Sequence, residues 1–370
     1  MKVTITQPAI HAAATRRRPI TIFSIIFALA AAAAAQPPGG GFLPNSVQAV
    51  STVPANGDVN PYGVAFVPVG FPGSSLNPGD ILVSNFNNNQ NLQGTGTTIV
   101  RITPAGKQSL FFQGNTRQRG LSTALGILNS GYVMVGSFPT EDGTCGTAEP
   151  GSLLVLSQNG SVLGAITGSG IDGPWDMTLY EQGPNVAAFI SNALSGNIVR
   201  LDFALSPAGM QLEDSVIIAS GYMHRCDPAA LVVAPTGLVY EAATDTLFVA
   251  SSEDNAVFAV PSARTTTQNQ GTGTIVYQDA THLHGALAMA KAPNGDLLVS
   301  NNDVINGDPN QPSEIVEFTR NGEFVKELSV DPNQGGSFGL MTRLAGNNTA
   351  KFAAVDDNQN MLFVWTLPAH

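Results

Sequence analysis

The stretch Asp245-Thr246-Leu247-Phe248-Val249-Ala250-Ser251-Ser252 decides the fold, because similar stretches recur along the whole chain. Most copies begin at a turn residue, continue with apolar residues and end in small polar residues. Short apolar runs bounded in this way are typical of buried β-strands. The other copies are Gly79–Asn85, Gly131–Ser137, Val186–Asn192, Gly295–Asn301 and Lys351–Asp356. A spacing of about 50 residues between copies predicts a repeated all-β unit.

Each unit reads as four short strands. A strand rich in small residues precedes each copy, as in Pro61–Ala65, and two further strands follow, as in Ser152–Leu156 and Val162–Ile166. Small residues suit the crowded centre of a β-propeller, where inner strands converge. The sixth unit lacks a fourth strand, and residues 47–52 supply one. We therefore predict an all-β, six-bladed β-propeller whose N-terminal strand closes the last blade and removes its open edge; seven blades or an irregular sandwich are the alternatives.

The N-terminus carries the pattern of a targeting segment. Arg16, Arg17 and Arg18 precede an apolar, alanine-rich stretch that ends in Ala33-Ala34-Ala35. This arrangement predicts a signal peptide over residues 1–35, with an uncleaved anchor as the alternative. A Pro/Gly-rich linker over 36–46 and the propeller over 47–370 follow. The predicted blades span approximately 61–116, 120–170, 171–222, 227–282, 283–334, and 335–370 together with 47–54.

The charge balance excludes some partners. The chain has a formal net charge of −11, and removing residues 1–35 takes away four cations and no acids, which lowers it to −15. A strongly acidic surface has no electrostatic attraction for nucleic acid or anionic lipid. No later segment has eighteen consecutive apolar residues. We therefore expect an extracytoplasmic protein, secreted or periplasmic, with no nucleic-acid partner and no membrane partner after signal cleavage.

Two segments resemble known repeat families. Pro293–Ser300 resembles the strand-turn signature of NHL-type repeats, and Pro235–Leu238 with Leu247–Ser251 resembles the gluconolactonase and strictosidine-synthase-like propellers. This likeness implies a six-bladed propeller. Fold-level likeness does not transfer function.

The histidines indicate a candidate face. His224, His282 and His284 all fall in connections that run from an outer strand to the next inner strand, which places them at the same end of a propeller. Polar residues at the ends of second strands, Asp356 among them, should surround the same end. The candidate binding residues are His224, Asp227, His282, His284, Trp175, Asp176, Tyr62, Arg119, Asn85 and Asn302. Surface histidines with purely local hydrogen bonds are the alternative.

A divalent metal, calcium or zinc, suits part of this set. Imidazole nitrogens are good metal ligands and can act as general bases, so His224, His282 and His284 are candidates. The gluconolactonase resemblance adds Asp172, because Asp172-Gly173-Pro174 is similar to the Glu-Gly-Pro of that family. The family's Pro-Asn-Gly-Leu motif has Thr236 in place of its asparagine here, which removes an amide ligand. The oxygen-rich loop 301–308 is a second place where calcium would fit.

The two cysteines predict a disulfide. Cys145 lies between the second and third strands of unit two, and Cys226 lies in the connection into unit four. Both loops belong to the histidine-bearing end, and exported proteins fold in an oxidising compartment. We expect a Cys145–Cys226 bond, with two free thiols as the alternative.

These observations favour a secreted propeller that binds a small molecule or a protein partner on its histidine-bearing face. A metal-dependent, lactonase-like hydrolase or lyase on the same face is the main alternative, and a purely structural propeller is a third. Whether the chain is an enzyme stays open at this stage, because its repeat framework is complete whereas its match to the gluconolactonase motifs is not.

Overall fold

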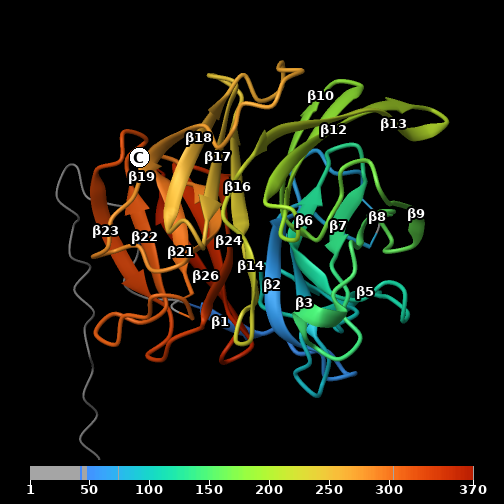
Figure 1. The fold of residues 1–370 in the computed structure, drawn as a ribbon. Helices are drawn as coiled ribbons and strands as arrows, with labels where there is room; N and C mark the ends of the chain where they lie inside the picture. Colours follow the sequence, from blue (N-terminus) through green and yellow to red (C-terminus); the bar gives the residue numbers. More distant parts are fainter. Residues whose placement is uncertain (1–41, 44–47, 74, 303, 370) are drawn as a thin grey trace, which may run out of the picture. The chain divides into compact units, whose positions relative to one another are not determined.

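A computed structural model describes residues 42–43, 48–73, 75–302 and 304–369. The signal peptide predicted over 1–35 lies outside the described residues. The described chain forms six four-stranded antiparallel sheets that make the blades of a β-propeller, which confirms the predicted fold class (Figure 1). Its helical content is a single 3₁₀ turn, η1 (Cys145–Thr147), in the residues that the structure describes.

The strands take the predicted order from the centre outwards in every blade. The inner strands are β2 (Val59–Phe66), β6 (Leu121–Ile127), β10 (Pro174–Gln182), β16 (Pro235–Glu241), β20 (Ala286–Lys291) and β24 (Ser337–Gly346). The second strands are β3 (Ile81–Asn87), β7 (Val133–Ser137), β11 (Asn185–Asn192), β17 (Thr246–Ser251), β21 (Leu297–Asn301) and β25 (Thr349–Asp356). The third strands are β4 (Thr98–Ile102), β8 (Ser152–Leu156), β12 (Asn197–Ser206), β18 (Ala256–Pro261), β22 (Glu314–Phe318) and β26 (Met361–Pro368). The outer strands are β5 (Gln108–Gln113), β9 (Val162–Ile166), β13 (Gly209–Ser220), β19 (Thr274–Tyr277), β23 (Phe324–Ser329) and β1 (Gln48–Ser51).

The N-terminal strand closes the last blade, as predicted. β1 pairs with β26 in the register Gln48↔Val364 to Ser51↔Met361, and Figure 1 shows the blue β1 near the red strands of that blade. The N–H of Thr52 continues the contact by donating to the carbonyl of Asn360 at 2.9 Å. This pairing joins the two ends of the propeller and satisfies backbone groups that an open edge would expose.

Small residues let the inner strands approach closely. A Cβ built on Gly339 would lie 1.7 Å from the carbonyl oxygen of Tyr62, and one built on Gly237 would lie 2.4 Å from that of Leu287. Neither position has room for a side chain, because the neighbouring inner strand occupies the space. The glycines in the predicted inner strands are therefore required by the convergence of the blades.

Two features depart from the predicted strands. β12 and β13 are ten and twelve residues long and form an extended hairpin, whereas the sequence predicted short strands in every unit. A small hairpin, β14 (Arg225–Asp227) and β15 (Leu231–Val233), lies in the connection into blade four, where no strand was predicted. The predicted linker also contributes to the core, since Phe42 and Leu43 are buried and their N–H groups donate to Glu317 at 2.8 and 3.1 Å.

Candidate functional site

An aromatic cluster fills the end of the propeller where the inner strands begin. Tyr62 stacks between Phe338 and Phe86, with ring centroids 3.9 and 4.6 Å away. Trp175 meets Tyr62, Phe86 and Phe138 edge to face at 5.4–5.8 Å. All five rings are buried. Tyr62 and Trp175, which the sequence analysis gave as candidate binding residues, are therefore buried in the core of this structure.

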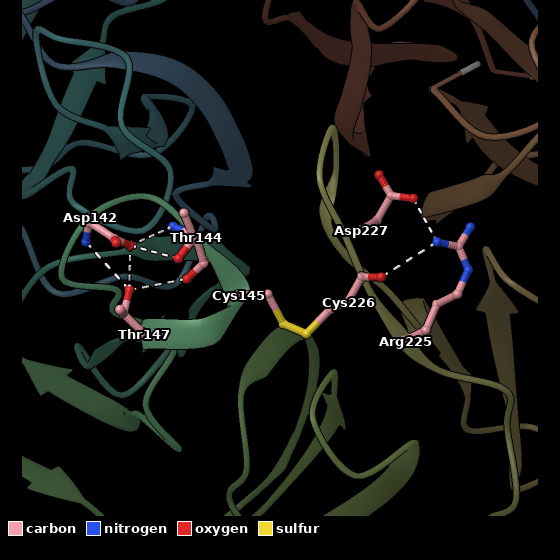
Figure 2. Close-up of a disulfide and its surroundings, with 7 residues drawn as sticks. All are labelled: Asp142, Thr144, Cys145, Thr147, Arg225, Cys226 and Asp227. Atoms are coloured by element: carbon pink, nitrogen blue, oxygen red, sulfur yellow. Dashed lines mark hydrogen bonds and ion pairs between the residues drawn. A yellow bond between two sulfur atoms is a disulfide. The ribbon is translucent and has the colours of Figure 1, made fainter.

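The β14–β15 hairpin packs against this aromatic cluster. Leu231, Val232 and Ala234 belong to the same buried apolar group as the five aromatic rings. The Cys145–Cys226 disulfide, with its Cα atoms 5.7 Å apart, joins η1 to β14, which confirms the predicted bond (Figure 2). We call this end of the propeller the capped end, because the aromatic cluster, the hairpin and the disulfide occupy its centre.

Ion pairs and capping hydrogen bonds flank the disulfide on both sides. Arg225 contacts Asp227 at 2.6 Å and Glu253 at 2.9 Å. On the other side the carboxylate of Asp142 accepts hydrogen bonds from the hydroxyls of Thr144 and Thr147 at 2.7 and 2.6 Å (Figure 2). Asp227 also accepts from two backbone N–H groups of the hairpin turn. Asp227, a predicted ligand-binding residue, thus holds the hairpin in shape.

The three histidines make separate local contacts. His224 is exposed, and its Nδ1 lies 3.1 Å from the carbonyl oxygen of Tyr222. His282 stacks on Phe324 at 3.8 Å, and its Nδ1 lies 2.9 Å from a carboxylate oxygen of Asp279. These contacts use the ring nitrogens within each histidine's own loop.

His284 contacts the oxygen-rich loop 301–308. Its Nδ1 lies 2.6 Å from the carbonyl oxygen of Asn306, and its Nε2 lies 3.2 Å from that of Thr281. Asp172, the fourth predicted metal ligand, is half-buried, and its N–H donates to Asn192. Within the described ranges, no three His, Cys, Asp or Glu side chains form a group that could hold a metal ion. The predicted metal set is therefore not brought together in this part of the chain.

The predicted asparagines and Arg119 anchor the segments that lead into the blades. We call the connection from an outer strand to the next inner strand a lead-in segment. Asn85 donates to the carbonyl of Thr52 at 3.2 Å, and Asn302 donates to that of Gly335 at 3.0 Å. The carbonyl of Arg119 accepts from the hydroxyl of Ser137 at 2.7 Å. These contacts give Asn85 and Asn302, both buried, a structural role.

A central channel occupies the middle and later residues of the six inner strands. The cavity has a volume of about 280 Å³ and is lined by residues from all six inner strands. Its walls are mostly aliphatic, with Leu125, Met177, Leu238 and Met289 among them. The aromatic cluster lies at the beginnings of the same strands, so the channel belongs to the opposite end, which we call the channel end.

Asp176 is the acidic residue of the channel wall. Its side chain is 7 % exposed, and its two oxygens accept the N–H groups of Met177 at 2.7 Å and Leu238 at 3.2 Å. Burial raises the pKa of this carboxyl to about 8, and the two backbone donors oppose that rise. Asp176 is therefore mainly a neutral carboxylic acid at pH 7. Thr123 lines the same cavity, and its hydroxyl has no hydrogen-bond partner within the described residues.

Ion pairs border the channel end. Lys291, a lining residue, contacts Glu241 at 2.5 Å, and Arg320 contacts the same carboxylate at 2.8 Å. These two cations lower the pKa of Glu241 to about 2 despite its burial. Glu241 is therefore ionised at neutral pH. Charged side chains thus border the channel end, while the cavity itself holds one neutral acid among mostly aliphatic side chains and a few threonines.

In the part of the chain that the structure describes, no helix is long and apolar enough to cross a membrane.

Comparisons with known proteins support the fold. No protein-family model and no curated protein sequence matches the chain. Among solved structures, a proposed oxidoreductase (glucose dehydrogenase) from Thermus thermophilus is similar at 14% identity and a TM-score of 0.50, over 86% of this chain and 100% of that one. Luciferin-regenerating enzyme is similar at 9% identity and a TM-score of 0.50, over 87% and 95%. A catalytically inactive virginiamycin B lyase from Staphylococcus aureus, solved with quinupristin, has 14% identity and a TM-score of 0.48, over 88% and 89%. At these identities the likeness to the two structures with a TM-score of 0.50 shows a shared fold and no more.

Proposed function

We propose that this chain is an extracytoplasmic propeller that binds a small, mainly apolar molecule with one hydrogen-bond acceptor in its central channel. The observation that carries the proposal is Asp176, a buried carboxyl in the wall of a cavity of about 280 Å³. Ligand sites are typically concave and apolar with a few placed polar groups, and this cavity is near the lower end of their size range.

The chemistry of Asp176 selects the ligand class. Both of its oxygens already accept backbone N–H groups, so the neutral acid has one O–H left to donate. A ligand with a carbonyl or ether oxygen satisfies that donor, whereas a ligand carboxylate would bring a second acid into an apolar cavity. Neutral ketones, lactones and esters with a compact hydrocarbon body fit both conditions.

The proposed location of the protein, outside the cytoplasm, rests on features that the sequence analysis identified. The Cys145–Cys226 disulfide is compatible with an oxidising compartment outside the cytoplasm. The acidic charge and the signal-peptide pattern over 1–35 support export. The NHL-type and gluconolactonase-like membership is also part of the proposal, supported by the propeller fold.

The capped end is the less favourable place for the ligand. The sequence hypothesis put small-molecule binding, or a metal-dependent hydrolase or lyase, at His224, His282 and His284. Their ring nitrogens contact carbonyl or carboxylate oxygens, and the aromatic cluster and the hairpin occupy the centre of that end. We therefore assign the small-molecule site to the channel end.

The test uses two probes of nearly equal size, cyclohexanone and methylenecyclohexane, titrated by ligand-observed NMR at pH 6.5 into residues 36–370. Only the ketone accepts a hydrogen bond, so we expect it to bind about tenfold more tightly, the value of one neutral hydrogen bond. Asp176→Leu should remove that preference, and Asp172→Asn, an acid outside the channel, should keep it. Equal binding of the two probes, or a ketone preference that survives Asp176→Leu, would overturn the proposal.

A further inference from the structure

One residue has an equivalent position in all six blades. It is the second-strand residue whose partner on the inner strand directly precedes the first shift of register. We call it the latch position. From blade one to blade six it holds Asn85, Ser137, Asn192, Ser251, Asn301 and Asp356.

In the first five blades the latch side chain is a hydrogen-bond donor. Four of them donate to a carbonyl oxygen of the lead-in segment of the same blade: Asn85 to Thr52, Ser137 to Arg119, Asn192 to Gly170 and Asn301 to His282, at 2.5–3.2 Å. The fifth, Ser251, donates to the carboxylate of Asp254 at 2.6 Å. In these five blades the latch side chain therefore acts as a hydrogen-bond donor.

Blade six replaces this donor with an acid that faces another acid. Asp356 contacts Asp331 of the lead-in segment, and both residues are buried, at 0 % and 3 % exposure. A Cβ built on Gly336 would lie 2.9 Å from the Cβ of Asp331 and 3.0 Å from an oxygen of Asp356, so the two side chains flank this glycine closely. Neither acid forms an ion pair with Lys or Arg within the described residues.

The surroundings of the acid pair supply only neutral hydrogen-bond donors. Asp331 accepts from the side-chain amide of Gln359 at 2.6 Å and from the N–H of Asn333 at 2.7 Å. Asp356 accepts from the N–H of Gln359 at 3.1 Å through one oxygen, and its other oxygen is buried without a partner in the described structure. Two buried carboxylates in contact repel each other unless a proton or a cation lies between them.

A second, independent oxygen faces the same place. Ser337, at 1 % exposure, pairs directly with Asp356 across β24 and β25, so both side chains project from the same face of the sheet. Its hydroxyl oxygen has no partner in the described structure. The residues that pair with the other five latches are Pro61, Leu121, Pro174, Pro235 and Ala286, which have no side-chain oxygen. Blade six alone combines an acidic latch with a hydroxyl opposite it.

We propose that blade six binds a calcium ion between the carboxylates of Asp331 and Asp356, with the hydroxyl of Ser337 as a third ligand. Calcium takes oxygen ligands only and completes its shell with carbonyls and waters, which suits a site that offers carboxylates, a hydroxyl and side-chain amides. The ion takes the place of the donor that the other latches provide, and it holds the lead-in segment of the blade that β1 closes.

A shared proton is the competing way to relieve the repulsion. Burial and the neighbouring Asp331 raise the pKa of Asp356 to about 7, whereas hydrogen bonds from Gln359 and Asn333 lower that of Asp331. Burial and the charge of Asp356 also raise the pKa of the adjacent Asp357 well above its ordinary value. Calcium and the proton compete, so calcium should bind more tightly at pH 8 than at pH 6.

The experiment is isothermal titration of calcium chloride into EDTA-treated, untagged residues 36–370 at pH 8, paired with thermal unfolding with and without the ion. We expect one equivalent of calcium and a higher Tm in its presence. Asp356→Asn restores the side chain of blades one, three and five, so it should fold, lower calcium affinity by more than about 100-fold and make the Tm indifferent to calcium. Ser337→Ala should weaken binding by about tenfold, and the control Asp172→Asn should leave it unchanged.

No calcium binding by the wild-type protein at pH 8 would overturn the proposal, as would calcium binding that Asp356→Asn leaves intact. A Tm that follows pH alone and ignores calcium would assign the pair to a shared proton instead. Should Asp356→Asn fail to fold, Ser337→Ala decides the question, because unchanged calcium affinity in that variant would contradict the assigned ligand set.

Discussion

The two ends of the six inner strands differ in what they bury. The capped end buries aromatic rings, Tyr62 and Trp175 among them, beneath a disulfide-linked hairpin. The channel end leaves a cavity with aliphatic walls around the neutral acid Asp176. The same strands thus combine one end that contributes packing energy with another end that leaves room for a ligand. The comparison teaches that the two ends of one set of inner strands can be packed in different ways, which is why we propose the channel end, and not the histidine-bearing end, as the ligand site.

The largest effect is expected at the centre of the capped end. Trp175→Ala removes a buried indole that contacts three other rings, and we expect it to lower the free energy of unfolding by about 3–5 kcal/mol. Urea denaturation measures this change. Leu163→Ala on the exposed outer strand β9 is the control, with an expected change of under about 0.5 kcal/mol. Similar values for the two variants would mean that the aromatic cluster does not stabilise the propeller.

The disulfide gives the next largest effect and separates the two ends. Replacing Cys145 and Cys226 by serine frees a bond that spans 81 residues, and we expect a loss of about 2–4 kcal/mol in unfolding free energy. Cyclohexanone binding should stay unchanged below the melting temperature, because the channel lies at the opposite end. A loss of ketone binding in the folded double-serine variant would place the ligand at the capped end instead.

The sequence correctly predicted the features that depend on the repeat period and on the order of the strands. The recurring second strands, the closure by β1 and the Cys145–Cys226 bond all follow from spacing along the chain. The burial of individual side chains was harder to predict, since the sequence at the start of β10 gives no sign of whether the Trp175 ring is exposed or packed in a cluster. The β14–β15 hairpin was missed because Arg225–Asp227 lacks an alternating apolar pattern. The Cys145–Cys226 disulfide fixes this segment in place.

The candidate site depended on three-dimensional pairing. Asp176 was one of ten candidate binding residues, and only the convergence of six inner strands shows that it lines a channel. Asp356 was noted at a strand end, but its partner Asp331 lies 25 residues earlier in a segment without a motif. The pair is found by comparing equivalent positions in the six blades. Those positions can be aligned only when the strand register of each sheet is known.

The pH dependence of ketone binding tests the central claim most directly. If the neutral carboxyl of Asp176 donates the hydrogen bond, the dissociation constant for cyclohexanone should be constant below its pKa of about 8 and rise above it, by about tenfold in all at pH 10, where the hydrogen bond is lost. Asp176→Asn keeps an N–H donor that does not titrate, so its dissociation constant should stay flat from pH 6 to pH 10. A wild-type curve that is flat over this range, or an Asp176→Asn curve that rises like that of the wild type, would contradict the account.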